Sequence, residues 1–195
     1  MIRIWLLATI WPWIGPSADP ASLQLARGEV RVVCPLTIGG SFEAKTMAVA
    51  GSLSLVGAHP PAYSGEISVD LHTLDTGIGL RNTHLRDRYL EVDKGDGFDK
   101  AVVSGIQLAE VDSDTFQGRT SFTGTLLLHG VRKPIAGRVQ IHRSRSAVRA
   151  EASFPVTLAD YGIAKPQYLG VGVKNEVQVR ATFDLTPAAA ASTSR

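Results

Sequence analysis

Histidines have the broadest chemistry of the residues in this chain, because a neutral imidazole can act as a base or as a metal ligand. There are five of them, His59, His72, His84, His129 and His142. No two stand four residues apart on a predicted helix. The sequence also has no H-E-x-x-H, C-x-x-C, G-x-S-x-G or G-x-x-x-x-G-K motif. It therefore predicts no metal site and no catalytic residue, although distant strands can still assemble an active site.

Other reactive or polar groups give weaker signals. Asp93, Asp96 and Asp99 lack the spacing of a calcium-binding loop and predict a polar turn. Cys34 is the single cysteine, so the chain cannot form an internal disulfide. We expect Cys34 to be a small buried hydrophobe in or beside the first strand.

One segment has helical periodicity. Leu85, Tyr89 and Val92 recur at i, i+4 and i+7, which predicts a helix of about three turns over residues 80–92. Either residue of the pair Asp75-Thr76 could cap its start. In a protein made of strands, a single helix of this kind serves as a lid, as a plug or as ordinary packing.

The predicted helix carries cationic side chains on one face. Arg81, His84 and Arg88 stand at i, i+3 and i+7. At the mouth of a barrel such side chains could hold a phosphate or carbonyl head group. The alternative is a solvated polar face, since Asp87 and Glu91 are close by.

Most of the remaining chain alternates between apolar and polar residues. Ile67, Val69 and Leu71 alternate with Ser68 and Asp70, a period of two that is typical of a strand with one buried face. About eight short strands of this kind, separated by turn residues, predict an antiparallel sandwich or barrel. The pattern appears in nine runs, at residues 29–33, 41–48, 51–55, 67–71, 102–111, 122–129, 135–143, 147–156 and 173–185.

The length and the net charge limit the number of domains and the kinds of partner. The 195 residues suit one domain with short appendages, and the net charge of +2 does not favour a nucleic-acid partner. Residues 1–21 combine Arg3, a short apolar stretch and small residues, which predicts a signal peptide cleaved between Ser17 and Ser22. We therefore expect a folded domain over residues 22–187 and a disordered tail over 188–195.

Three segments, in this order, carry a resemblance to a known family. They are residues 81–85 (RNTHL) leading to 89–92 (YLEV), residues 124–134 (GTLLLHGVRKP), and residues 154–163 (FPVTLADYGI) followed by 170–177 (GVGVKNEV). Over about residues 30–185 the chain resembles the YceI family of bacterial lipid-binding proteins. The resemblance implies an all-β fold, an eight-stranded antiparallel lipocalin-like barrel with one short helix. It also implies a periplasmic location and a polyisoprenoid or similar long-chain lipid inside the barrel, and it is compatible with a homodimer.

An eight-stranded barrel can hold one slender ligand if every second residue of each strand faces an apolar interior. We expect the strand residues of this lining to be Phe42, Val69, Leu71, Phe122, Leu126, Leu128, Val139, Ile141, Phe154, Val177 and Val179. Leu85 and Tyr89 of the predicted helix should join them. Tyr161 and Tyr168 are expected to flank the mouth with an apolar ring and a polar tip. Arg81, His84 and Arg88 are the candidates for contact with the head group.

The sequence thus predicts an exported binding protein that transports or stores a polyisoprenoid or isoprenoid quinone, or acts in stress handling. It is expected not to be an enzyme, to use no cofactor apart from the bound lipid, and to touch membranes transiently. Two alternatives stay open. One is a lipid-modifying isomerase or hydrolase, in which His84 or His129 faces the ligand. The other is a structural module of the cell envelope with a solid core.

Overall fold

The computed structural model describes residues 22–188 apart from residues 59, 110, 112–114 and 169–170. The predicted signal peptide and all but the first residue of the predicted tail lie outside this range, as does His59.

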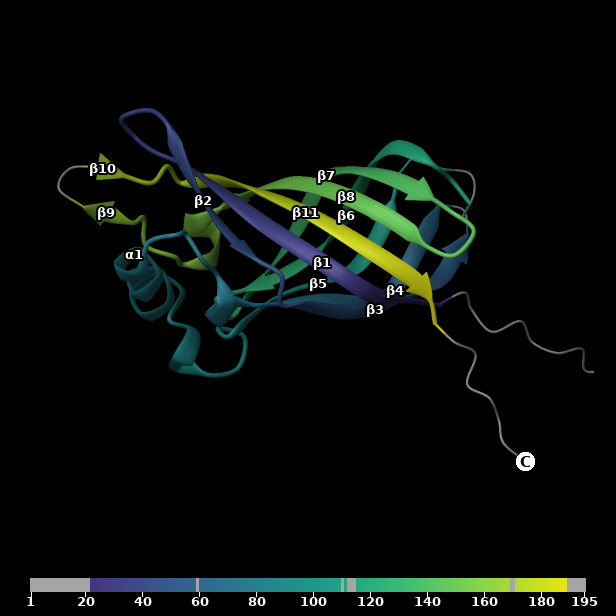
Figure 1. Ribbon diagram of the computed structural model, residues 1–195, viewed down its shortest axis with the longest axis horizontal. Coiled ribbons are helices and arrows are strands. Elements are labelled where there is room, and N and C mark those ends of the chain that lie inside the picture. Colours follow the sequence, from purple (N-terminus) through teal and green to yellow (C-terminus); the bar gives the residue numbers. More distant parts are fainter. Residues whose placement is uncertain (1–21, 59, 110, 112–114, 169–170, 189–195) are drawn as a thin grey trace, which may run out of the picture.

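Within this range, eight antiparallel strands close into a barrel (Figure 1). Neighbours around the barrel are β1, β3, β4, β5, β6, β7, β8 and β11, and β11 pairs back onto β1. The strands are β1 (Ser22–Pro35), β2 (Ser41–Thr46), β3 (Val49–Ala58), β4 (Pro61–Asp70), β5 (Lys100–Leu108), β6 (Gly118–Leu128), β7 (Val131–Arg143), β8 (Val148–Thr157) and β11 (Glu176–Pro187). This arrangement confirms the predicted all-β, eight-stranded, lipocalin-like barrel.

The additional strand β2 extends β3 rather than widening the barrel. It pairs with residues 30–35 of β1, whereas β3 pairs with residues 22–24 at the other end of the same strand. The two therefore act as one bent strand. A short ribbon of β9 (Gln167–Tyr168) and β10 (Val171–Gly172) packs against the β1–β2 hairpin, where the Thr37 N–H donates to the Gly172 carbonyl at 2.8 Å.

Alternation along each strand separates the inside of the barrel from the outside. On β8, Val148, Phe154 and Val156 are buried, whereas Arg149 and Glu151 between them are exposed. Successive side chains of a strand point to opposite faces, so one parity lines the interior and the other meets solvent. The predicted period of two is thus the feature that builds the core.

A helical segment lies at one end of the barrel, beside β9 and β10 (Figure 1). It consists of α1 (Gly79–His84), the π-helix η2 (Leu85–Leu90) and the 3₁₀ turn η3 (Val92–Lys94). Two further 3₁₀ turns, η1 (Leu71–Thr73) and η4 (Leu158–Tyr161), follow β4 and β8. Within the described part of the chain, none of the helices has the length and hydrophobicity of a membrane span.

The structure corrects details of the predicted helix. Its second half is a π-helix, and Val92 belongs to the separate turn η3. Neither Asp75 nor Thr76 caps it, because the capping position is Ile78, which makes no side-chain cap. Asp75 and Thr76 instead bind the side chain of Asn82, which lies one turn after Ile78.

Candidate ligand-binding cavity

The barrel encloses a cavity of about 240 Å³ that is lined by side chains from all its strands and from η2. The lining is apolar almost throughout. Protein pockets that hold small molecules span roughly 300–1,000 Å³. This interior therefore suits a slender ligand, and a long one has to displace some of the lining side chains.

Most of the predicted lining residues face this cavity. Those that line it are Phe42, Val69, Leu71, Leu85, Tyr89, Phe122, Leu126, Leu128, Val139, Ile141, Phe154, Val177 and Val179. Tyr161 does not flank the mouth, since it is 3% exposed and packs in the core outside the lining. Tyr168 lies in β9, and its side chain is not among those the structure describes. That the thirteen residues contact a lipid stays a prediction.

Several lining residues escaped the sequence reasoning. Ala44 and Ala152 face the cavity, but small side chains carry little periodic signal. Tyr63 stands in the first half of β4, before the point where the alternation becomes regular. Arg143 has the same parity as Val139 on β7, so the alternation itself could have identified it.

An aromatic pair forms part of the cavity wall. The rings of Phe122 and Phe154 meet edge to face, with centroids 5.9 Å apart and planes at 87°. Gly137 lies between them on β7, directly opposite Phe122 in the register. A Cβ atom at Gly137 would stand 2.8 Å from Phe122 Cε1 and 2.7 Å from Phe154 Cβ. The missing side chain of Gly137 is therefore what makes room for the two rings.

The helical segment covers the cavity at one end, and hydrogen bonds attach it near its start, in its middle and at its end. Leu85, Tyr89 and Leu90 of η2 line the cavity, whereas α1 buries none of its residues. At the start of the segment the Asn82 amide donates to Asp75 Oδ1 at 2.7 Å. This hydrogen bond is the main reason why the pKa of Asp75 lies below its ordinary value.

A histidine holds the other terminus of the helical segment. His129 Nδ1 stands 2.9 Å from the Tyr161 carbonyl oxygen and Nε2 stands 3.0 Å from Glu91 Oε2. Both partners are acceptors, so the imidazolium form, which donates from both nitrogens, satisfies this geometry. Lys94 and, to a smaller extent, His129 lower the pKa of Glu91 by hydrogen bonding. Phe98 packs its ring against the imidazole at 4.6 Å.

A second histidine contacts the same stretch of chain two residues further on. His72, which lies in η1, places Nδ1 3.0 Å from Asp70 Oδ1. Its Nε2 is 3.2 Å from Asp93 Oδ1. The two carboxylates raise the pKa of His72, with Asp93 contributing most. His72 and His129 together fasten the turn that follows η2.

The three cations predicted to contact a head group do not line the cavity. The Arg81 guanidinium lies over the Phe42 ring at 4.3 Å, His84 is half-buried and Arg88 is exposed. The prediction that they share one face relied on the α-helical repeat of 3.6 residues. In η2 the turns are wider, with i→i+5 hydrogen bonds, so the residues after Leu85 point in other directions than in an α-helix. Arg81 and Arg88 therefore do not form one site.

Cys34 faces the cavity near this end. Burial raises the pKa of its thiol to about 11, and nearby Arg81 opposes the shift. The thiol is therefore neutral at physiological pH and behaves as part of the apolar wall. Among the residues that the structure describes, no three His, Cys, Asp or Glu side chains are grouped so that they could hold a metal ion.

A closed antiparallel barrel with an apolar interior and a helix across one end defines the lipocalin-like class of β-barrels. The YceI-like domain model matches residues 22–185, and the chain therefore belongs to the YceI family. No curated protein matches the chain.

Solved structures of the same fold include three from bacteria. Burkholderia cenocepacia BcnA is 13% identical with a TM-score of 0.63, and the match covers 80% of this chain and 95% of BcnA. A polyisoprenoid-binding domain from Saccharophagus degradans, implicated in plant cell wall breakdown, is 16% identical with a TM-score of 0.63 over 86% and 99% of the two chains. The Campylobacter jejuni YceI protein is 13% identical with a TM-score of 0.53 over 72% and 82%. At these identities the likeness concerns the fold alone.

Proposed function

We propose that this protein binds one long apolar lipid, a polyisoprenoid or an isoprenoid quinone, inside its barrel, and that it carries or stores the lipid without transforming it. The observation that carries the proposal is the cavity of about 240 Å³ with an apolar lining. The description of the similar Saccharophagus degradans domain as polyisoprenoid-binding supports the choice of ligand class.

The hydrophobic effect is sufficient to hold such a ligand. Each buried methylene contributes roughly 0.8 kcal/mol, so one five-carbon isoprene unit offers about 3 kcal/mol before ordering costs. A few units therefore reach tight binding without any chemical step. Covering the chain inside a barrel keeps an insoluble molecule out of water.

The positions of the histidines favour binding over catalysis. An enzyme that isomerises or hydrolyses the lipid needs an acid or base within reach of the reacting atom. His84 is not part of the cavity wall, and both ring nitrogens of His129 face Tyr161 and Glu91. The open interior likewise disfavours a purely structural module with a solid core.

We also propose that the protein acts in the periplasm after export. The composition of residues 1–21 and membership of the YceI family support this location. A carrier in that compartment would collect its lipid from a membrane and release it to one.

The proposal is tested by extracting protein purified from a bacterial host with organic solvent and identifying the lipid by mass spectrometry. Ala152→Phe provides a blocked cavity, because Ala152 lines the cavity between Val139 and Ala181 of the neighbouring strands. Ser153→Phe is the matched control, since the next residue along β8 is exposed.

We expect about one long-chain lipid per wild-type and Ser153→Phe molecule, and a much smaller amount from Ala152→Phe. Wild-type protein that is empty, or an Ala152→Phe variant that carries as much lipid as its control, would contradict the proposal.

A further inference from the structure

Two histidine rings attach the turn that follows η2 to the rest of the protein. His129, between β6 and β7, places Nε2 3.0 Å from Glu91 Oε2. His72, in η1, places Nε2 3.2 Å from Asp93 Oδ1. The two carboxylates stand two residues apart, directly after the part of the helical segment that covers the cavity. Both histidines therefore hold the same end of this cover.

Each of the two rings has an acceptor at both of its nitrogen atoms. His129 Nδ1 faces the Tyr161 carbonyl oxygen, and His72 Nδ1 faces Asp70 Oδ1. An imidazolium donates from both nitrogens, whereas a neutral imidazole donates from one and presents a lone pair at the other. Loss of the proton from either ring to solvent therefore removes one hydrogen bond and places a lone pair opposite an acceptor.

The groups around His72 favour its protonated form. The end of β4 contributes the Asp70 carboxylate, and η3 contributes that of Asp93. From η2, Arg86 Nη1 donates to the backbone carbonyl oxygen of His72 at 2.7 Å. Asp93 and then Asp70 raise the pKa of the imidazole. The ring therefore releases its proton only above the ordinary pKa of histidine.

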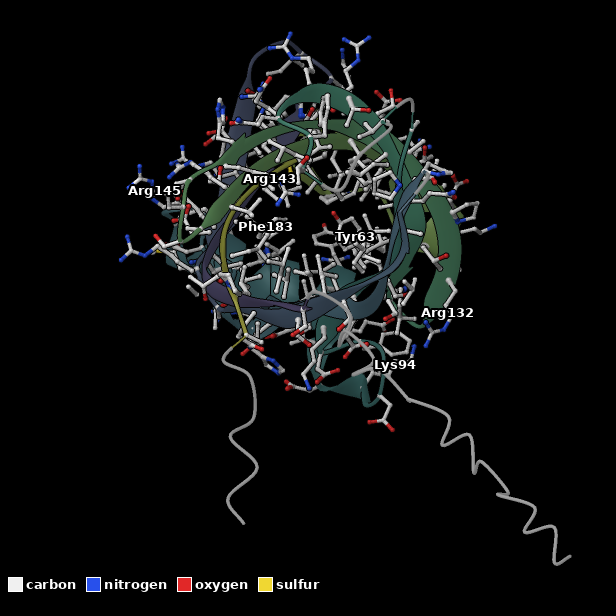
Figure 2. All side chains as sticks on the ribbon, turned by 90° about the vertical axis from the view of Figure 1, so that its right-hand side faces the viewer. Tyr63, Lys94, Arg132, Arg143, Arg145 and Phe183 are labelled. Carbon is white, nitrogen blue, oxygen red and sulfur yellow. The ribbon has the colours of Figure 1, made fainter. Side chains whose placement is uncertain are left out.

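The groups around His129 keep its acceptors in place at every pH at which histidine titrates. Lys94 Nζ lies 3.1 Å from Glu91 Oε2 and lowers the pKa of this carboxyl group, which therefore stays ionised. From η4 comes the carbonyl oxygen of Tyr161, next to Asp160 in the sequence, and this acceptor does not titrate. Figure 2 looks along the barrel from the end opposite α1 and shows Lys94 outside the barrel wall.

Contacts that do not depend on pH keep the same stretch of chain folded. After the turn, the Gly130 N–H donates to the Gly97 carbonyl oxygen at 2.8 Å. Leu90 and Val92 are 7% and 2% exposed, so apolar packing retains the turn when the histidines are neutral. Loss of the histidine hydrogen bonds should therefore loosen the cover without unfolding the barrel.

We infer that the His72–Asp93 and His129–Glu91 contacts form a proton-dependent latch on the cavity: the protonated latch retains the lipid, and its deprotonation lets η2 move so that the lipid enters or leaves. Leu85 and Leu90 of η2 line the cavity, so their movement opens its wall. The latch is complete at low pH and is lost as the pH rises through the pKa values of the two rings in the folded protein. This inference rests on the proposed function, to which it adds the route and the regulation of lipid exchange.

Dissociation of a fluorescent apolar probe, N-phenyl-1-naphthylamine, tests the inference. Stopped-flow mixing of the loaded protein with excess farnesol measures the dissociation rate at about pH 5.5 and about pH 8.5, on either side of the ordinary pKa of histidine. Neither the probe nor farnesol changes its charge between these values. A difference in rate therefore reports a change in the protein.

Two conservative substitutions remove the charge from the latch. Glu91→Gln and Asp93→Asn keep the shapes of the side chains, and an amide can accept from an imidazolium or donate to a neutral ring. Each contact should therefore persist when the histidine loses its proton. Asp96→Asn is the matched control, because Asp96 is exposed in the same connection and is not the acceptor at either histidine.

In wild-type protein we expect the probe to dissociate about 10-fold faster at the higher pH, the effect of one hydrogen bond to a charged group. The double variant Glu91→Gln/Asp93→Asn should lose most of this pH dependence, and Asp96→Asn should retain it. Hydrogen exchange of residues 85–94 in wild-type protein, corrected for the intrinsic effect of pH, should also be faster at the higher pH. This second measurement requires no variant to fold.

Two results would overturn the inference and leave the proposed function intact. One is wild-type protein that releases the probe at the same rate at both pH values, as expected if exchange occurs at the end of the barrel around Tyr63 and Phe183, which faces the viewer in Figure 2. The other is a double variant with the same pH dependence as Asp96→Asn. A protein that binds neither the probe nor farnesol at either pH would instead overturn the proposed function.

Discussion

Gly137 offers a quantitative test of how the interior is packed. A Cβ atom at this position would stand 2.4 Å from the Ser153 carbonyl oxygen, in addition to its close approach to Phe122 and Phe154. The Phe122 ring can turn toward the cavity, but the Ser153 carbonyl and the Phe154 Cβ belong to the paired strand β8 and cannot move alone. Gly137→Ala should therefore strain the β7–β8 pairing and push the aromatic pair into the cavity.

The expected cost follows from two opposing effects. Overpacking a core costs about 1–3 kcal/mol, and the backbone contact places this substitution in the upper half of that range. Alanine recovers about 0.5–1 kcal/mol, because glycine loses more conformational freedom when a strand folds. The net loss is about 2 kcal/mol, which for a domain of this size lowers Tm by about 4–8 °C.

Scanning calorimetry of lipid-free protein measures this loss, since bound lipid would raise Tm by mass action. Gly57→Ala is the control, because its new Cβ would meet Ala62 Cβ at 3.5 Å and the Pro60 carbonyl oxygen at 3.7 Å, both ordinary contacts. We expect its Tm to stay close to that of wild type. A Gly137→Ala protein that has the same Tm as the Gly57→Ala control and binds a fluorescent apolar probe as tightly as wild type would refute the packing argument.

Three further predictions concern titratable groups and the helical segment. The pKa of His72 is raised in the folded protein. Its contribution to stability is therefore complete below the ordinary pKa of histidine and is lost as the pH rises through the pKa of the folded state. Asp93→Asn should lower the pKa of His72 in an NMR titration and weaken this pH dependence of stability. Because burial raises the pKa of Cys34 to about 11, a thiol reagent at pH 8 should label it far more slowly than free cysteine, and bound lipid should slow labelling further; equal rates would contradict its placement. Leu85→Ala removes part of the cover over the cavity and should speed probe dissociation a few-fold in stopped-flow measurements, whereas Leu80→Ala, at an exposed position on α1, should not.

Alternation in the sequence predicted an antiparallel sandwich or barrel, and the resemblance to the YceI family decided for the barrel. Residues such as Phe122, Leu126 and Val139 could be assigned to the interior because a strand with one buried face repeats every two residues. The same rule extends to Arg143, the last residue of β7, which also faces inward. Small inward residues such as Ala152 give no comparable signal.

The helical segment shows where sequence patterns stop being informative. Its existence followed from the spacing of Leu85 and Tyr89, but the π-helical turns did not, and they separate Arg81 from Arg88. The contact between His129 and Glu91 joins residues 38 positions apart, so no local pattern predicts it. Both residues also adopt left-handed backbone conformations, with φ of 51° and 49°, that tertiary contacts maintain.

The most direct test of this account is a high-resolution crystal structure of the protein saturated with a long-chain isoprenoid. We predict continuous electron density for the chain inside the barrel, in contact with Phe122, Phe154 and Tyr89, and a widened cavity compared with the present volume of about 240 Å³. Side chains that close the interior, with the lipid bound on the outer surface or not at all, would contradict the claim that the barrel is a lipid container.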